Sequence, residues 1–207
     1  DVDKYEDKLG SYLVKVGNCD LSRHDNHTFS ILLHCMSDFE RISDHAINIV
    51  ESAKEMNDKS LVFSKKAKAE METITRAVHD IVAKTVAVFN SESVEAAVHI
   101  EPLEDVIDGL TKEIKQNHVK RLTKGKCTIE LGVILEDVLT NLERVSDHCS
   151  NVAVEMVAIH EGGYDTHEIF NSMSEQERAS YDKEYKELKS LYRINGKDDK
   201  MKKKNSV

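Results

Sequence analysis

The eight residues Asn141-Leu-Glu-Arg-Val-Ser-Asp-His148 decide the fold, because a second version of them, Asp38-Phe-Glu-Arg-Ile-Ser-Asp-His45, occurs earlier in the chain. When both stretches are extended to the next asparagine, six of eleven aligned residues are identical, at a constant offset of 103 positions. Similarity at a fixed offset is typical of an internal repeat. The chain is therefore predicted to contain two related halves.

Each copy contains a glutamate and an aspartate four positions apart, Glu40 with Asp44 and Glu143 with Asp147. On a helix, side chains at this spacing lie on the same face. With 38 acidic residues in the chain, about seven such pairs are expected by chance, so a single pair carries little information. The repetition with fixed neighbours singles these acids out.

The composition favours an all-α fold. The chain has 207 residues, one Pro, eight Gly, no Trp and 5% aromatic residues, whereas an all-β fold needs turn residues and aromatic strands. The net charge of −9 argues against a nucleic-acid partner and makes a cation the more natural ligand. No apolar run of about 18 residues and no signal peptide is present, so we expect no membrane span in this segment.

Two further features bear on the cellular context. The four cysteines form no C-x-x-C motif and lie in or beside apolar helical segments, which is typical of reduced residues in a cytosolic protein. The sequence begins with Asp rather than Met, which indicates a fragment of a longer protein.

Apolar residues recur at steps of three and four positions, which predicts a series of helices. Their expected ranges are 1–16, 29–56, 61–89, 94–122, 129–160 and 175–192. We expect Asp25 or Thr28 to cap the second helix and Ser93 to cap the fourth. Pro102 would lie inside the fourth helix and kink it. The last helix is expected to be short and exposed, and the lysine-rich end, residues 197–207, to be disordered.

The repeat extends beyond the acidic stretch. Tyr5-Glu-Asp-Lys-Leu9 aligns with Val106-Ile-Asp-Gly-Leu110, so the first two expected helices correspond to the fourth and fifth. The third has no counterpart before Asp1. We therefore predict two tandem antiparallel three-helix bundles, the first of them truncated. The expected units are residues 1–60, residues 61–161 and a charged extension, residues 162–207.

A second set of acidic pairs falls on the helices expected to pack beside the first set. Each half could then bring four carboxylates together on its surface, because a helical wheel turns all of them away from the apolar seam. The candidate metal ligands are Glu40, Asp44, Glu143, Asp147, Glu104, Asp108, Asp3 and Asp7. All-oxygen ligands select hard ions such as Mg²⁺, Mn²⁺, Ca²⁺ or iron, and such a group could bridge more than one ion.

Other polar residues adjoin the acids in both copies and form a candidate supporting set. They are His45, His148, Asn48, Asn151, Arg41 and Arg144. The histidines are rotated about 100° from the acids, which favours packing or a second coordination shell over direct ligation. The asparagines share the face of the aspartates and would give polar support. The arginines either form surface ion pairs with the acids, leaving a solvated face without metal, or hold an anion such as phosphate.

An enzyme is the rival class. Di-iron carboxylate enzymes built on helical bundles use Glu-x-x-His motifs, and none of the ten histidines here has an acid three positions before it. Outward-facing carboxylates also lack a dry substrate pocket. There is no nucleophile constellation and no Gly-rich phosphate loop. The sequence favours a protein that is not an enzyme.

The two repeated stretches resemble the paired E-x-x-x-D motifs of PhoU domains. Tyr5-Glu-Asp-Lys-Leu9 and His118-x-x-Arg121-Leu122, followed by Gly125-Lys-Cys127, are more similar to the PhoU-like region that follows the membrane part of bacterial sodium/phosphate cotransporters. The resemblance covers roughly residues 1–167. Ser43 and Ser146 stand where family members often have Gly or Ala, a change that the outer helix face should accept.

The resemblance implies a protein that controls phosphate uptake and binds multinuclear iron or related metal clusters on its acidic motifs. The first expectation is a regulatory domain at the cytoplasmic face of the cell membrane, acting on a sodium-dependent transporter domain in the same chain or in a partner. A homodimer is compatible with it. The alternative is a stand-alone PhoU-type adaptor between a phosphate ABC transporter and a sensor kinase, and a further alternative is a structural bundle without a ligand.

Overall fold

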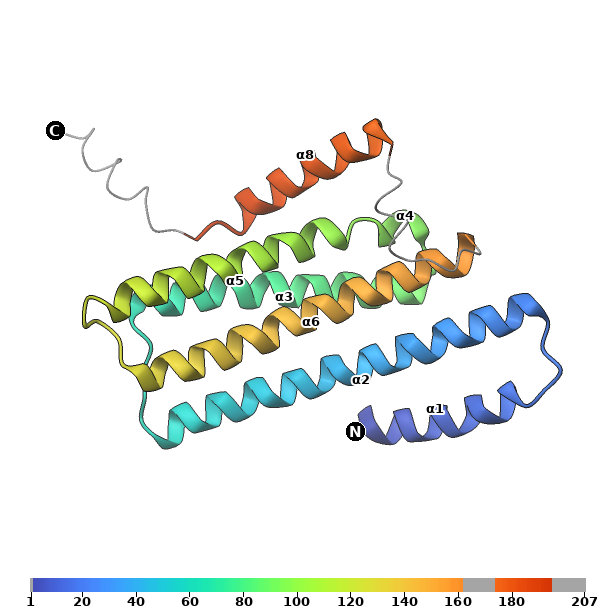
Figure 1. Ribbon diagram of the computed structural model, residues 1–207, viewed down its shortest axis with the longest axis horizontal. Coiled ribbons are helices and arrows are strands. Elements are labelled where there is room, and N and C mark those ends of the chain that lie inside the picture. The colour runs from blue at the N-terminus through green and yellow to red at the C-terminus, as the bar shows by residue number, and fades with distance from the viewer. Residues whose placement is uncertain (1, 162–173, 195–207) are drawn as a thin grey trace.

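The computed structural model describes residues 2–161 and 174–194, and within these ranges every regular element is a helix (Figure 1). The helices are α1 (Val2–Gly17), α2 (Arg23–Asp58), α3 (Lys65–Ser91), α4 (Val94–Ala97), α5 (Glu101–Leu122), α6 (Ile129–Glu161) and α8 (Glu175–Leu191). The all-α prediction is confirmed. No helix in these ranges has both the length and the hydropathy needed to cross a bilayer.

The helix α2 starts earlier than the apolar spacing predicted. Its N-cap is Ser22, whose hydroxyl accepts a hydrogen bond from the backbone N–H of Asp25 at 3.1 Å. The expected caps Asp25 and Thr28 are therefore wrong, and part of the expected loop is helical. A polar first turn carries no apolar period, so only the cap chemistry could have located it.

The predicted helix over 94–122 is two helices. Ser93 caps α4, its hydroxyl accepting from the Ala96 N–H at 3.1 Å, as expected. Pro102 lies in the first turn of α5 rather than inside a helix, so the expected kink is wrong. The first turn has no intrahelical acceptor for its N–H groups, and a proline there loses no hydrogen bond. Its rigid ring instead fixes where α5 begins.

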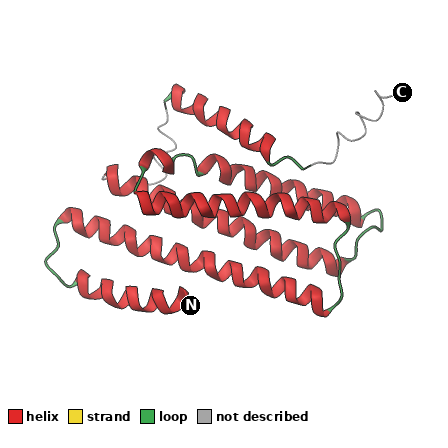
Figure 2. Cartoon of the chain, turned by 180° about the vertical axis from the view of Figure 1, so that it is seen from behind, coloured by secondary structure: helices red, strands yellow, loops and turns green. Residues whose placement is uncertain are grey.

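Consecutive long helices run antiparallel, and α6 occupies the centre of the molecule. It packs along α2 on one side and against α3 and α5 on the other, while α1 lies outside α2 and α8 lies outside α5 (Figures 1 and 2). Fully buried side chains such as Ile74, Ile107, Leu139 and Val152 join these helices into one hydrophobic core. The division into units at residues 60 and 161 stays a prediction.

The outer helix α1 is only lightly packed. Its periodic residues Tyr5, Leu9 and Tyr12 are 67%, 49% and 63% exposed, and none of its residues is buried. The predicted helix is present, but a single neighbour, α2, cannot enclose its apolar face. The acids on α1 are consequently held less firmly than those on α5.

The last described helix, α8, is present as predicted but is docked rather than free. Tyr192 at its end is 3% exposed and donates its hydroxyl to Asp80 Oδ2 at 2.6 Å. His99 Nδ1 lies 2.6 Å from Glu184 Oε2, and the Tyr181 hydroxyl bonds Asp105. The expected disordered end, residues 197–207, lies outside the described residues.

Candidate metal site

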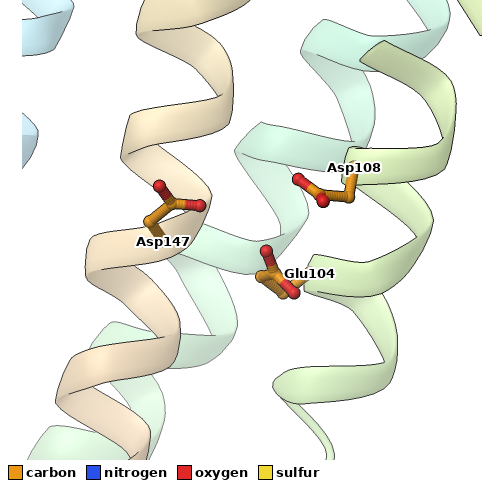
Figure 3. A group of neighbouring side chains, drawn as sticks. All are labelled: Glu104, Asp108 and Asp147. Carbon is orange, nitrogen blue, oxygen red and sulfur yellow. The ribbon is translucent and has the colours of Figure 1, made fainter. Parts of the chain in front are cut away.

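Three of the eight predicted metal ligands converge between two helices. Figure 3 shows Glu104 and Asp108, one turn apart on α5, facing Asp147 on α6. One carboxylate oxygen of each lies within 4.8 Å of the other two, which is close enough for a common ion. Among the described residues, this is the one group of three or more possible ligands that meets this condition.

The electrostatics of this triad favour a bound cation. Burial, followed by the charges of Asp108 and other nearby acids, raises the pKa of Glu104 to about 8. Without a cation the side chain therefore carries a proton at neutral pH, and a metal ion would have to displace it. The donor set consists entirely of oxygen, so it fits Mg²⁺, Mn²⁺, Ca²⁺ or iron better than Zn²⁺ or Cu⁺.

Two basic side chains compensate the aspartates of the triad. Lys112 Nζ lies 3.0 Å from Asp108 Oδ2, and Arg144 Nη1 lies 3.1 Å from Asp147 Oδ2. The Arg144 contact is the surface ion pair that the sequence left open as one alternative. Arg41, its counterpart in the first repeat, is exposed.

Glu143 is not a member of the triad. Its Oε2 lies 3.7 Å from Lys115 Nζ, and the same ammonium lies 2.8 Å from Glu136 Oε1. The four-residue spacing placed Glu143 one turn before Asp147 on α6. It could not reveal that a lysine on α5 stands opposite.

The acids of the first repeat lie close together without forming such a group. Burial, then a hydrogen bond and charge from Asp44, then the charges of Glu6 and Asp3, raise the pKa of Glu40. Glu6 was missed by sequence reasoning, although it stands one turn after Asp3. Asp7 is exposed on α1.

The predicted supporting histidines and asparagines join α2 to α6 instead of facing the acids. His45 Nδ1 lies 2.8 Å from Asn141 Oδ1, and the Asn48 amide donates to the same oxygen at 3.0 Å. In the other direction, His148 Nδ1 lies 2.6 Å from Asp38 Oδ1, which also accepts from Asn151 at 3.3 Å.

These contacts are reciprocal between the repeats. The His and Asn of each copy bind the first residue of the other copy, and the rings of His45 and His148 stack with centroids 5.5 Å apart. The sequence did not predict that Asp38, which is 8% exposed, and Asn141 would bind these side chains. The available signal was their matched position at the start of each repeated stretch.

A large cavity opens beside the triad. It has a volume of about 1190 Å³ and is lined by Glu104, Asp147 and Arg144, among others. Arg23 and His27 line it from the α2 side. The metal position therefore has room on one side for water or for an anionic co-ligand.

Comparisons with known proteins agree with this fold. The sequence model of the PhoU domain matches residues 71–156, which include all three residues of the triad. "Phosphate-specific transport system accessory protein PhoU homolog 1" of Thermotoga maritima is 28% identical over 131 residues, covering 63% of this chain and 56% of that protein. This chain thus spans little more than half the length of that relative.

A solved structure is similar as well. The crystal structure of PhoU from Pseudomonas aeruginosa aligns with a TM-score of 0.73 at 18% identity, covering 78% of this chain and 77% of that one. At this identity the similarity concerns the fold alone. These comparisons support the resemblance expected from the repeated acidic motif, since residues 71–156 of this chain match the PhoU domain model.

Proposed function

We propose that this protein is a non-enzymatic, PhoU-type regulator of phosphate uptake that binds a hard metal ion between α5 and α6. The observation that carries the proposal is the convergence of Glu104, Asp108 and Asp147 inside the segment that matches the PhoU domain. Three like charges held this close would repel one another unless a proton or a cation intervenes.

The stand-alone accessory role is better supported than the transporter-attached one. The Thermotoga maritima relative is named as an accessory protein of a phosphate-specific transport system, and the expected similarity to the cotransporter region rests on short motifs alone. In this role the protein would act at the cytoplasmic face of the membrane, on a separate transporter. Attachment to a sodium-dependent transporter remains the second candidate. It requires apolar spans of about 18 residues in the same chain, so the sequence encoded before Asp1 would distinguish it from the stand-alone role.

The geometry supports one ion at the triad. Two aspartates and one glutamate supply three ligand atoms, and the remaining coordination positions would face the adjacent cavity. Water or a phosphate oxygen could occupy them, with Arg144 and Arg23 supplying positive charge nearby. A multinuclear cluster would need further ligands, for which Glu143 would have to leave Lys115.

Elemental analysis tests the proposal directly. Wild-type protein, purified after growth with iron and manganese, should carry metal in stoichiometric amount, and Glu104→Gln/Asp147→Asn should not. The matched control is Glu72→Gln/Glu95→Gln, which removes two exposed acids outside the triad. Equal, near-zero metal in all three proteins, each folded by circular dichroism, would favour a structural bundle without a ligand and refute the metal site.

A further inference from the structure

A strongly basic groove lies on the side of α5 that faces away from α6. It runs between α3, α5 and α8, which lie side by side in Figures 1 and 2, and it has a volume of about 1200 Å³. Ten of the chain's 29 Lys and Arg residues line it, against two glutamates. A protein with a net charge of −9 thus gathers a third of its cations around one hollow.

Few acids of the described residues neutralise this positive charge. Of the two glutamates, the buried Glu70 is already bound by Arg121 at 2.7 Å and by Asn117 at 3.1 Å. Lys112 is paired with Asp108 of the triad. The lining lysines that have no carboxylate within 4.0 Å among the described residues are Lys65, Lys66, Lys120, Lys124, Lys126, Lys186 and Lys189.

The groove depends on the packing of α8 against the core. One wall is α8, which contributes Lys186 and Lys189 and lies outside the segment that matches the PhoU domain. Lys189 Nζ is held 5.0 Å above the ring of Tyr185 and donates to its hydroxyl at 3.1 Å. The buried Tyr192, which also lines the groove, donates to Asp80 and so ties the end of α8 to α3. Packing of α8 against the core therefore keeps like charges close together, although their repulsion opposes it.

A small, highly charged anion satisfies this arrangement best. Charges beyond about 8 Å are largely screened at physiological ionic strength, so a ligand inside the groove experiences the local cations and little of the negative net charge. A nucleic acid or a flat membrane surface extends beyond the groove and would meet the acidic remainder of the molecule. Lysine ammonium groups are point charges suited to phosphate oxygens, and several spread along a groove suit several linked phosphates.

We propose that the groove between α3, α5 and α8 binds an anion with a short phosphate chain, such as a nucleoside triphosphate or inorganic tripolyphosphate. Both compounds contain a chain of linked phosphates, which is the group that the lysines would bind. The groove shares no lining residue with the cavity beside the triad, although its Lys112 also pairs with Asp108, and the proposal does not rest on the proposed function.

Calorimetric titration of the full chain in EDTA tests the proposal, because chelation prevents a phosphate compound from binding through a metal at the triad. Tripolyphosphate and ATP are titrated in separate arms, with orthophosphate as a third. The groove variant is Lys65→Gln/Lys124→Gln/Lys186→Gln, and its matched control is Lys15→Gln/Lys54→Gln/Lys84→Gln, three exposed lysines outside the groove. We expect saturable binding that weakens at least about tenfold in the groove variant and less than about twofold in the control, since only the former loses phosphate contacts.

Comparison of the arms identifies the ligand. Tighter binding of ATP than of tripolyphosphate would add recognition of a nucleoside, and equal binding would assign the site to the phosphate chain alone. The proposal is overturned by absence of saturable heat at about 1 mM ligand, by equal weakening in both variants, or by orthophosphate binding as tightly as tripolyphosphate. Binding to phosphatidylglycerol vesicles but not to tripolyphosphate would also overturn it, in favour of a membrane surface. The metal content of the groove variant is measured as well. If it equals that of the wild type, a failure of the groove proposal leaves the proposed metal site unaffected.

Discussion

Replacing Glu104 by Gln should stabilise the metal-free protein at alkaline pH and abolish metal binding. The pKa of Glu104, raised from 4.5 to about 8 mainly by burial, means that the folded state holds the proton more tightly than the unfolded state. The neutral side chain contributes its full stability below pH 4.5, and this contribution is lost as the pH rises through 8. Glutamine mimics the protonated form at every pH.

The size of the effect follows from the same values. A rise from 4.5 to about 8 corresponds to roughly 5 kcal/mol for a carboxylate that water cannot reach. Glu104 is partly exposed, so screening by water reduces the expected gain at pH 9 to about 2 kcal/mol. In a chain of this length that gain would raise Tm by about 4–8 °C.

Urea unfolding in EDTA, followed by circular dichroism from pH 5 to pH 9, measures this gain. The wild type should lose stability relative to Glu104→Gln as the pH rises, and Mn²⁺ added in excess of the EDTA should stabilise the wild type but not Glu104→Gln. Glu72→Gln, an exposed acid on α3, serves as the control and should follow the wild type. Lower stability of Glu104→Gln than of the wild type at pH 9 would refute the electrostatic reasoning, and equal stabilisation of both by Mn²⁺ would refute the assigned ligand.

Three other perturbations probe the rest of the molecule. Asp38→Ala should cost about 2–4 kcal/mol in urea unfolding because it leaves His148 buried without its partner, whereas Asp38→Asn should cost less; equal costs would contradict the pairing. Glu155→Gln should stabilise the protein by about 1–2 kcal/mol at pH 8.5 and by little at pH 5. Burial raises the pKa of Glu155 to about 7, so its ionisation above that pH opposes folding, and a gain independent of pH would count against this cause. Tyr192→Phe should cost about 1 kcal/mol through its lost bond to Asp80 and should speed amide hydrogen exchange in the last helix more than elsewhere; uniform exchange would show that the bond does not hold that helix.

Periodicity located the helices, but local chemistry decided where they begin. The spacing of apolar residues could not show that Ser22 caps α2 or that Pro102 opens a new helix, because caps and first turns carry no apolar period. Ser146 shows a different limit. It was expected on the outer face and is fully buried, because α6 is packed on several sides and a single apolar seam underestimates how much of it is covered.

The site was predictable as far as the repeat reached. The acidic pairs of the two repeats included Glu104, Asp108 and Asp147, whose carboxylates lie close together, but the lysine opposite Glu143 comes from another helix and gives no local signal. The net charge argued against a nucleic-acid partner, but a net charge is an average over the molecule and cannot show a local basic groove. The groove lysines come from segments far apart in the sequence, and the fold alone brings them together.

The reciprocal hydrogen bonds between α2 and α6 bear on how the two copies could have diverged. Each copy supplies the hydrogen-bond partner for the histidine of the other copy. A substitution of Asp38 or Asn141 would therefore first affect the histidine on the opposite helix. The copies also differ, since one histidine meets the carboxylate of Asp38 and the other the amide of Asn141. Replacing either half by a duplicate of the other would give two carboxylates or two amides at this junction. The two copies therefore supply different groups to this junction, and one copy could not replace the other without changing it.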